Sequence, residues 1–247
     1  MGGELNPVDL ARQDIGLFLD VDGTLLDLAP RPDAVEVPAG LREALAGAEQ
    51  RLDGALALVS GRAIDTLDRL FHPLRLRASG LHGAEIRHSA DAPATCLTPA
   101  ELPERAWLEL LRLLEDFPGT LAENKAVGFA VHYRLSPVLP ETLRAALERF
   151  ADSLPEYGLR VRHGRRVFEI GPTGLDKGTA IQSFMKEEPF ARRRPVFVAD
   201  DRMDWPGFEA ALAHGGFAFS VGEALPGLSG WFDEPEAVRA WVGMLAR

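Results

Sequence analysis

Short hydrophobic runs alternate with longer amphipathic segments in the first and last parts of the chain. Three of the runs predict buried strands: Ile15 to Leu19, Ala55 to Val59 and Pro195 to Ala199. Two other segments, Leu41 to Leu52 and Ile64 to Phe71, carry apolar side chains at helical spacing. Because strands that alternate with helices are typical of parallel sheets, we expect an α/β core.

The middle of the chain shows a different pattern, a helix followed by two strands, and this pattern occurs twice. The first copy consists of a helix at Glu104 to Phe117 and strands near Leu121 to Lys125 and Phe129 to Arg134. The second consists of a helix at Pro140 to Leu154 and strands at Leu159 to Arg162 and Val167 to Ile170. This αββαββ order predicts a small α+β domain. We expect it at residues 91–172, inserted into a core of residues 1–90 and 173–247.

The composition is that of a soluble globular protein and limits the classes of partner. The 247 residues are 46% hydrophobic and 26% charged, and the formal net charge is −10. Because this negative charge repels nucleic acid and anionic lipid, we expect neither nucleic acid nor membrane as a partner. Cys96 is the only cysteine, which excludes an internal disulfide and fits a reducing compartment. Met1 to Asp14 lacks the pattern of a secretory signal, so we expect a cytoplasmic protein.

The strongest chemical signal is the sequence Asp20-Val21-Asp22-Gly23-Thr24, directly after the first predicted strand. Side chains at the carboxyl ends of parallel strands point into the crevice where α/β sheets bind ligands. Two crowded carboxylates repel each other unless a cation or a shared proton is present. The alternative is a simple turn in which Asp22 caps a helix, but the position after a buried strand favours a functional site.

Further polar residues follow the other predicted strands. Ser60 ends the second strand, and Asp200, Asp201 and Asp204 follow the third. Taken alone, Ser60 could equally cap a helix. Clustered acids need a cation, and a few oxygen ligands suit Mg²⁺, which keeps several of its waters. The six histidines and the single cysteine give no sign of a zinc site.

Lys177 stands at the start of a predicted helix, in Gly174-Leu175-Asp176-Lys177-Gly178. A lysine there can simply be solvated. However, a cation at a helix N-terminus opposes the helix dipole unless an anion lies nearby. We therefore expect Lys177 to face an anionic group.

These motifs resemble the four signatures of the haloacid-dehalogenase-like (HAD) phosphatases. The first is Asp20 to Thr24, the second Ser60, the third Lys177 and the fourth Asp200-Asp201 with Asp204. The resemblance implies a HAD-like Rossmannoid core with a parallel sheet and a small inserted α+β cap domain of C2B type.

A narrower resemblance is to the trehalose-6-phosphate phosphatases. Its motifs are Gly80-Leu81-His82-Gly83-Ala84-Glu85, Glu123-Asn124-Lys125, His132-Tyr133-Arg134 and Glu169. In that family the cap contacts the sugar hydroxyls. The resemblance therefore implies substrate-binding roles for nine residues: Gly61, Arg62, His82, Glu85, Glu123, Lys125, His132, Arg134 and Glu169. The alternative for each cap residue is a solvated strand face.

The resemblance also implies the chemistry: hydrolysis of trehalose 6-phosphate to trehalose and inorganic phosphate, dependent on Mg²⁺. Asp20 is then the nucleophile, Asp22 the general acid and base, and Ser60 and Lys177 contact the phosphoryl group. The metal ligands implied are Asp20, the backbone carbonyl of Asp22, Asp200 and Asp201. Asp204 is implied to lie behind these ligands and to contact them rather than the metal. The partner is a small sugar phosphate, and functional coupling to a trehalose-phosphate synthase is a further expectation.

The fourth signature departs from the family pattern Gly-Asp-Asp-x-Thr-Asp-Glu. This chain has Ala199, Met203 and Trp205 in place of the glycine, threonine and glutamate. The departure leaves other functions open. One is a phosphatase for another sugar phosphate, such as sucrose phosphate or a glycosyl phosphoglycerate. Another is a catalytically weak regulatory protein that binds a phosphosugar.

Overall fold

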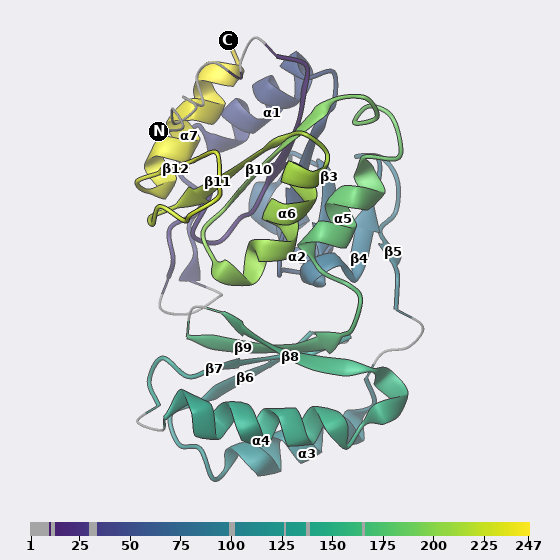
Figure 1. Cartoon of the computed structure of the whole chain (residues 1–247), viewed down its shortest axis with the longest axis vertical. Coiled ribbons are helices and arrows are strands. Elements are labelled where there is room, and N and C mark those ends of the chain that lie inside the picture. The colour runs from purple at the N-terminus through teal and green to yellow at the C-terminus, as the bar shows by residue number, and fades with distance from the viewer. Residues whose placement is uncertain are drawn as a thin grey trace. The chain divides into compact units, whose positions relative to one another are not determined.

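The computed structural model describes residue 10 and residues 13–29, 34–98, 102–125, 127–136, 139–164 and 166–247. The chain divides into two compact units (Figure 1). The core unit comprises Met1–Thr95 and Asp176–Arg247, and the inserted unit comprises Cys96–Leu175. The inserted unit thus lies a few residues further along the chain than the expected range 91–172. In the described part of the chain, none of the helices combines the length and hydrophobicity of a membrane span.

The core unit is built on a mixed sheet. The strands in their spatial order are β12 (Gly230–Phe232), β11 (Phe217–Val221), β10 (Arg194–Ala199), β1 (Ile15–Leu19), β2 (Leu56–Val59), β3 (Arg77–Gly80), β4 (Glu85–Arg87) and β5 (Thr95–Cys96). From β12 to β3 neighbouring strands run parallel, and β4 is antiparallel to β3. The three strands predicted from hydrophobic runs are confirmed as β1, β2 and β10.

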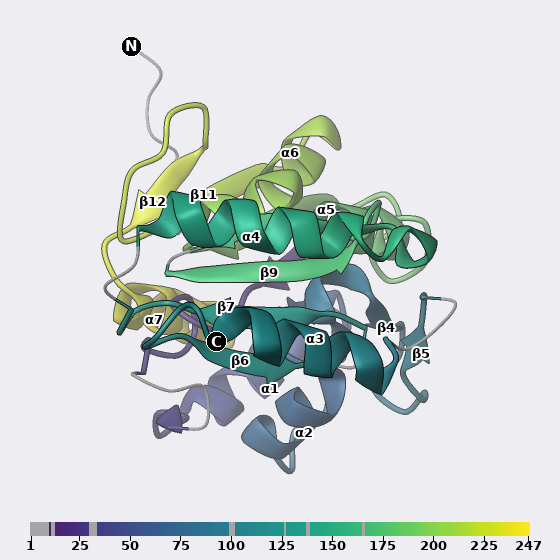
Figure 2. The same ribbon diagram turned by 90° about the horizontal axis from the view of Figure 1, so that it is seen from below.

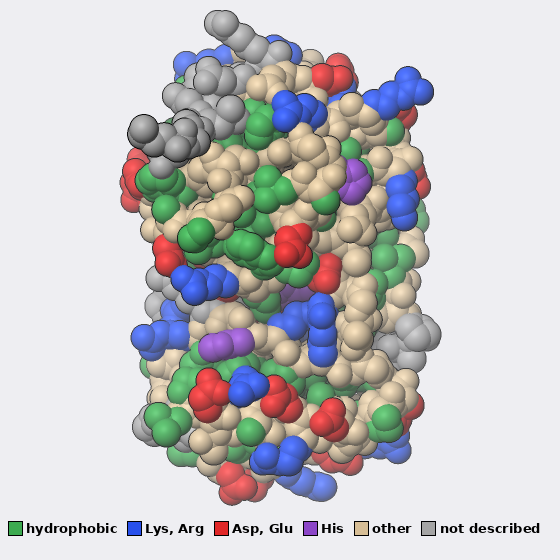
Figure 3. Space-filling view, in the orientation of Figure 1, with side chains coloured by type: hydrophobic (Ala, Val, Ile, Leu, Met, Phe, Trp, Pro, Cys, Tyr) green, Lys and Arg blue, Asp and Glu red, His purple; other side chains and the backbone are tan. Residues whose placement is uncertain are grey.

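Helices cover both faces of this sheet, which explains why its central strands are apolar throughout. On one face lie α1 (Leu41–Arg51) and α2 (Ile64–Phe71), and on the other lie α5 (Lys177–Phe184) and α6 (Trp205–Ala213) (Figure 2). The last helix, α7 (Pro235–Leu245), packs against α1. Charged side chains of both signs are interspersed over the face that Figure 3 shows, in keeping with a soluble surface.

The inserted unit has the predicted αββαββ order. Its elements are α3 (Glu104–Leu114), β6 (Leu121–Asn124), β7 (Phe129–His132), α4 (Pro140–Asp152), β8 (Leu159–Gly164) and β9 (Val167–Pro172). The antiparallel sheet has the order β6-β7-β9-β8. Buried side chains such as Leu110 of α3, Leu147 of α4 and Phe168 of β9 form one hydrophobic cluster. The helices therefore cover one face of the sheet, and the polar side chains lie on the other.

Three short 3₁₀ helices complete the described elements: η3 (Leu81–Gly83), η4 (Pro155–Tyr157) and η5 (Arg202–Asp204).

The register of the core sheet determines where the site lies. The central strand β1 is flanked by β10 and β2, and Leu19 pairs with Val198 on one side and Leu58 on the other. Because all three strands are parallel, their carboxyl ends meet at one edge of the sheet. Asp20, Ser60 and Asp200 follow these ends directly.

Candidate active site

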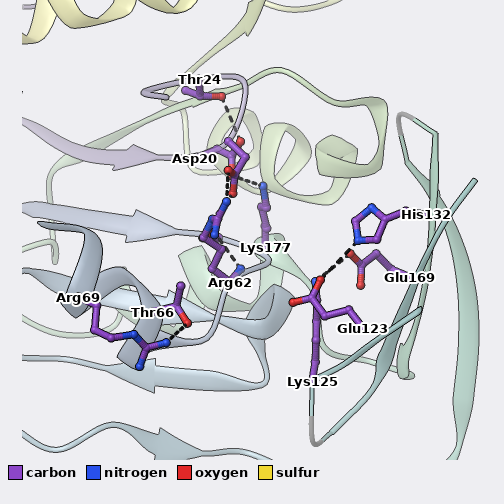
Figure 4. Close-up of polar contacts among 12 residues, drawn as sticks. Asp20, Thr24, Arg62, Thr66, Arg69, Glu123, Lys125, His132, Glu169 and Lys177 are labelled. Carbon is purple, nitrogen blue, oxygen red and sulfur yellow. Dashed lines mark hydrogen bonds and ion pairs between the residues drawn. The ribbon is translucent and has the colours of Figure 1, made fainter. Parts of the chain in front are cut away.

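Asp20 and Lys177 form a buried ion pair in the core unit. Their side chains are each 5% exposed, and Lys177 Nζ donates a 2.6 Å hydrogen bond to Asp20 Oδ1 (Figure 4). The same ammonium group lies 2.7 Å from Asp204 Oδ1. Lys177 is the first residue of α5, where the helix dipole disfavours a cation. The two carboxylates compensate for this position, so Lys177 is not a solvated surface lysine.

The loop after β1 holds Asp20 from its other side. Thr24 is fully buried, and its Oγ1 donates a hydrogen bond to Asp20 Oδ2 over 3.1 Å. Gly23 has a φ of 78°, which favours glycine, and a Cβ at this position would lie only 2.1 Å from Asp200 Oδ2. The loop therefore needs glycine both for its backbone conformation and for the close approach of Asp200.

Three carboxylates meet next to this loop. One oxygen each of Asp20, Asp200 and Asp204 lies within 4.8 Å of the other two. Asp204 is only 1% exposed. Its Oδ2 is buried, yet it accepts no hydrogen bond from any of the described residues. A buried carboxylate oxygen without a donor is costly unless a cation satisfies it. The oxygen-only set fits a hard divalent cation.

The pKa values of the clustered carboxylates also favour a bound cation. Burial, followed by repulsion from neighbouring carboxylates, raises the pKa of Asp200 to about 8. Burial also raises the pKa of Asp204, to about 7. It raises the pKa of Asp20 as well, and Lys177 opposes both shifts. Burial alone would lower the pKa of Lys177, but Asp20 and Asp204 outweigh it and raise that pKa. Near neutral pH Asp200 and Asp204 therefore retain protons in part, and a bound cation would displace them.

Asp201 precedes η5, and Asp204 is the last residue of this short helix. The Asp201 carboxylate accepts a hydrogen bond from the Met203 N–H over 2.9 Å and thereby caps η5. Asp204 lies at the end of this short helix and belongs to the carboxylate cluster, as described above. Among the described residues, the carboxylates close enough to hold one cation are those of Asp20, Asp200 and Asp204, and the role of Asp201 as a metal ligand stays a prediction.

The second strand end carries Ser60 and Arg62. Ser60 is 1% exposed, and its Oγ accepts a hydrogen bond from the Arg62 backbone N–H over 3.1 Å. The Arg62 guanidinium donates from Nε and from one Nη to the two carboxylate oxygens of Asp22, each over 2.7 Å (Figure 4). The second carboxylate of the first signature is thus held by a bidentate ion pair.

Three other residues expected to bind substrate make contacts within the core unit. The Glu85 carboxylate accepts a hydrogen bond from the Ile64 N–H over 2.8 Å and so caps the start of α2. The ring of His82 packs against Gly61. The approach is so close that a Cβ on Gly61 would lie 2.4 Å from His82 Nε2. Glu85 thus has a structural contact that explains its presence without a ligand.

Polar side chains of the inserted unit gather on the sheet face opposite its helices. Lys125 Nζ lies 2.9 Å from Glu169 Oε1, and His132 Nε2 lies 3.4 Å from Glu123 Oε2 (Figure 4). The hydrogen bond from His132 lowers the pKa of Glu123 despite partial burial. Ala130 pairs with Glu123 of β6 and with Glu169 of β9, which places both acids in one row across the sheet. Arg134 lies beyond the end of β7 and belongs to neither ion pair.

Two features of the site were not expected from the sequence. Thr24 stands in the first motif, and its position four residues after Asp20 is the only signal of its hydrogen bond. The pairing of Arg62 with Asp22 joins residues 40 positions apart, and no local pattern indicates it.

Comparison with known proteins identifies one family. The trehalose-phosphatase family model matches residues 18–223. A probable trehalose-phosphate phosphatase of Sinorhizobium fredii is 38% identical over 236 residues, covering 93% of this chain and 87% of the relative. The trehalose-6-phosphate phosphatase of Escherichia coli is 35% identical over 228 residues, covering 92% of this chain and 85% of the relative.

A solved structure shares the fold. The C-terminal domain of trehalose-6-phosphate phosphatase from C. albicans aligns with a TM-score of 0.79 over 98% of this chain and 97% of that chain. The identity is 21%, so this likeness supports the fold alone. BT1666 from Bacteroides thetaiotaomicron, described as a phosphatase of the haloalkanoate (HAD) enzyme superfamily, also aligns, with a TM-score of 0.57 and 18% identity.

Proposed function

The chain belongs to the trehalose-phosphatase family, and we propose that it hydrolyses trehalose 6-phosphate to trehalose and inorganic phosphate. The observation that carries this proposal is the buried group formed by Asp20, Lys177 and the carboxylates of Asp200 and Asp204. It combines a nucleophile, a cation and a set of metal-ligand oxygens in one place. In this role the protein would act in the cytoplasm on the product of a trehalose-phosphate synthase.

Asp20 is the proposed nucleophile. A carboxylate oxygen of Asp20 attacks the phosphorus atom, the bond to the sugar oxygen breaks, and an aspartyl-phosphate forms. Water then attacks this intermediate, which releases inorganic phosphate and restores the carboxylate. The ammonium group of Lys177, 2.6 Å from Asp20 Oδ1, offsets the negative charge that gathers around Asp20. Ser60, at the neighbouring strand end, is the proposed hydrogen-bond partner of the phosphoryl group.

Asp22 is the proposed general acid and base. It donates a proton to the departing sugar oxygen and later accepts one from the attacking water. Its carboxylate is 31% exposed, whereas that of Asp20 is almost fully buried. These different environments suit two carboxylates with different roles.

We propose Mg²⁺ as the metal. Asp20, Asp200 and Asp204 would hold it, and the resemblance to the family adds the backbone carbonyl of Asp22. The donor-less Oδ2 of Asp204 supports this assignment. When bound, the ion supplies positive charge that stabilises the phosphoryl oxygens. Asp201 would contribute by holding η5, through its contact with Met203, rather than as the leading ligand.

The inserted unit is the proposed sugar-recognition domain. Lys125, Glu169, Glu123 and His132 form two ion pairs on one sheet face, so they offer both donors and acceptors for hydroxyl groups. Charged partners of this kind give the stronger hydrogen bonds to a sugar.

A phosphate-release screen tests the function. We expect the wild-type protein to release phosphate from trehalose 6-phosphate with Mg²⁺ and to lose this activity with a chelator. Asp20→Asn should abolish release while the protein stays folded, because the amide is a far weaker nucleophile. Sucrose 6-phosphate and a glycosyl phosphoglycerate, measured in parallel, identify another substrate if trehalose 6-phosphate is not preferred. Tight binding of trehalose 6-phosphate without phosphate release would contradict the proposal and indicate a phosphosugar-binding protein.

A further inference from the structure

The bidentate contact between Arg62 and Asp22 occupies both oxygens of the Asp22 carboxylate. Both hydrogen bonds are 2.7 Å long, and the Arg62 side chain is only 14% exposed. Two parallel N–H···O bonds define the orientation of a carboxylate as well as its charge. The contact therefore fixes the plane in which the Asp22 carboxylate lies.

Arg62 is itself held firmly by the backbone around it. Its N–H donates to Ser60 Oγ, and its carbonyl accepts a hydrogen bond from the Leu81 N–H over 3.0 Å. Two residues later α2 begins at Ile64, whose N–H is bound by Glu85. The Arg62 backbone is thus anchored to the end of β2 and to η3, while Asp22 lies in the loop after β1. An arginine with an anchored backbone and a mostly buried side chain is suited to position a carboxylate that lies in a loop.

We propose that Arg62 is a positioning residue that acts through Asp22, holding this carboxylate where it can reach the departing sugar oxygen. The proposal rests on the proposed phosphatase function, and it differs from the direct substrate contact that the sequence analysis expected for Arg62. Proton transfer needs one Asp22 oxygen, so one of the two hydrogen bonds opens during turnover. The other continues to hold the carboxylate.

This role predicts a specific pattern of kinetic effects. If Arg62 acts through Asp22, its removal slows the step in which Asp22 moves a proton, and kcat falls while KM changes little. If Arg62 instead binds the substrate, KM rises. A misplaced general acid typically loses about 10–100-fold in rate. Loss of the acid itself costs about 10²–10⁴-fold, so the effect of Arg62 should be the smaller one.

A double-mutant cycle with trehalose 6-phosphate and Mg²⁺ tests the proposal. The variants are Arg62→Ala, Asp22→Asn and the combination of both, with phosphate release as the readout and thermal unfolding as the check on folding. We expect Arg62→Ala to lower kcat by about 10–100-fold in the wild-type background. In the Asp22→Asn background the same change should have almost no effect, because the group it positions is gone.

Two further variants sharpen the cycle. Arg69→Ala is the matched control, since Arg69 is exposed on α2 and its guanidinium donates to the Thr66 hydroxyl of the same helix (Figure 4). It should leave both kcat and KM unchanged. Arg62→Lys keeps the charge but loses the two parallel donors, so it should stay impaired and remain folded even if Arg62→Ala does not.

The outcomes separate the two proposals. An Arg62→Ala effect that persists in the Asp22→Asn background, or that appears mainly in KM, would overturn the positioning role. Full activity of Arg62→Lys would also overturn it, because charge alone would then suffice. Failure of the wild-type protein to release phosphate from any sugar phosphate would instead contradict the phosphatase function.

Discussion

Lys177 and Asp20 lie 157 positions apart in the sequence, yet the ammonium nitrogen of Lys177 is 2.6 Å from Oδ1 of Asp20 in the interior of the core unit. The same nitrogen contacts Asp204, so one cation is shared by two buried carboxylates. Removing one partner of a buried ion pair leaves an uncompensated charge and is strongly destabilising. The arrangement therefore links the chemistry of the site to the stability of the fold.

Replacing Lys177 with methionine should abolish phosphate release and lower the free energy of unfolding by about 3 kcal/mol at about pH 8. At about pH 5 the loss should be smaller, because Asp200 and Asp204, with pKa values of about 8 and 7, are protonated there and need less compensation. Urea unfolding at both pH values measures the difference. Lys186→Met, at an exposed residue just after α5, is the control. Equal destabilisation at the two pH values would contradict the assignment.

Gly23 provides a second test, of the contact between the loop and Asp200. An alanine at a φ of 78° costs about 1 kcal/mol for the backbone alone. In addition its Cβ would meet Asp200 Oδ2 at 2.1 Å, so Asp200 must move. Gly227→Ala is a matched control, because Gly227 has a φ of 86° and no atom within 4 Å of the added Cβ. Urea unfolding should show a larger loss for Gly23→Ala, and Mg²⁺ should bind it about tenfold more weakly or worse. The same loss for both variants would rule out the contact.

The carboxylate cluster predicts how pH and metal act together. Because the folded-state pKa values of Asp200 and Asp204 are raised from 3.8, the folded protein without metal binds more protons than the unfolded chain. The stability contributed by these groups is present at low pH and is lost as the pH rises through about 7 and 8. Metal competes with these protons, so Mg²⁺ should raise the melting temperature more at about pH 8.5 than at about pH 5.5.

Thermal unfolding with Mg²⁺ and with a chelator, at the two pH values, measures this effect. Asp204→Asn removes one of the titrating carboxylates, so it should weaken the dependence on both pH and Mg²⁺. A melting temperature that Mg²⁺ raises equally at both pH values would show that these carboxylates do not take up the ion.

Much of the core site could be predicted because it depends on sheet topology. A hydrophobic run that ends at Asp20, and two similar runs that end at Ser60 and Asp200, place three polar residues at one edge when the strands are parallel and adjacent. The register then brings these residues together whatever the details of packing. The position of Lys177 followed from the helix dipole, which made a cation at that place unfavourable without an anion.

Side-chain partners could not be predicted, because they depend on the conformations of loops and short helices. Asp201 and Asp204 are three positions apart, and only the 3₁₀ turn of η5 determines which of them faces Lys177. The sequence likewise gives no sign that Glu85 binds the N–H of Ile64 or that Arg62 binds Asp22. Carboxylates that cap helices and those that bind ligands are the same residues chemically, so only their geometry separates them.

The polar face of the inserted unit gives the last prediction, which concerns substrate specificity. Lys125 and Glu169 are 12% and 10% exposed and lie 2.9 Å apart, so a sugar hydroxyl there would meet both charges. Lys125→Ala should lower kcat/KM for trehalose 6-phosphate by about 10–100-fold, the value of one hydrogen bond to a charged group. A small phosphate ester without the sugar should react at nearly the wild-type rate. Arg144→Ala, which breaks exposed ion pairs on α4, should affect neither substrate. Parallel phosphate-release assays on both substrates decide the matter, because an equal loss on the two would mean that the inserted unit does not recognise the sugar.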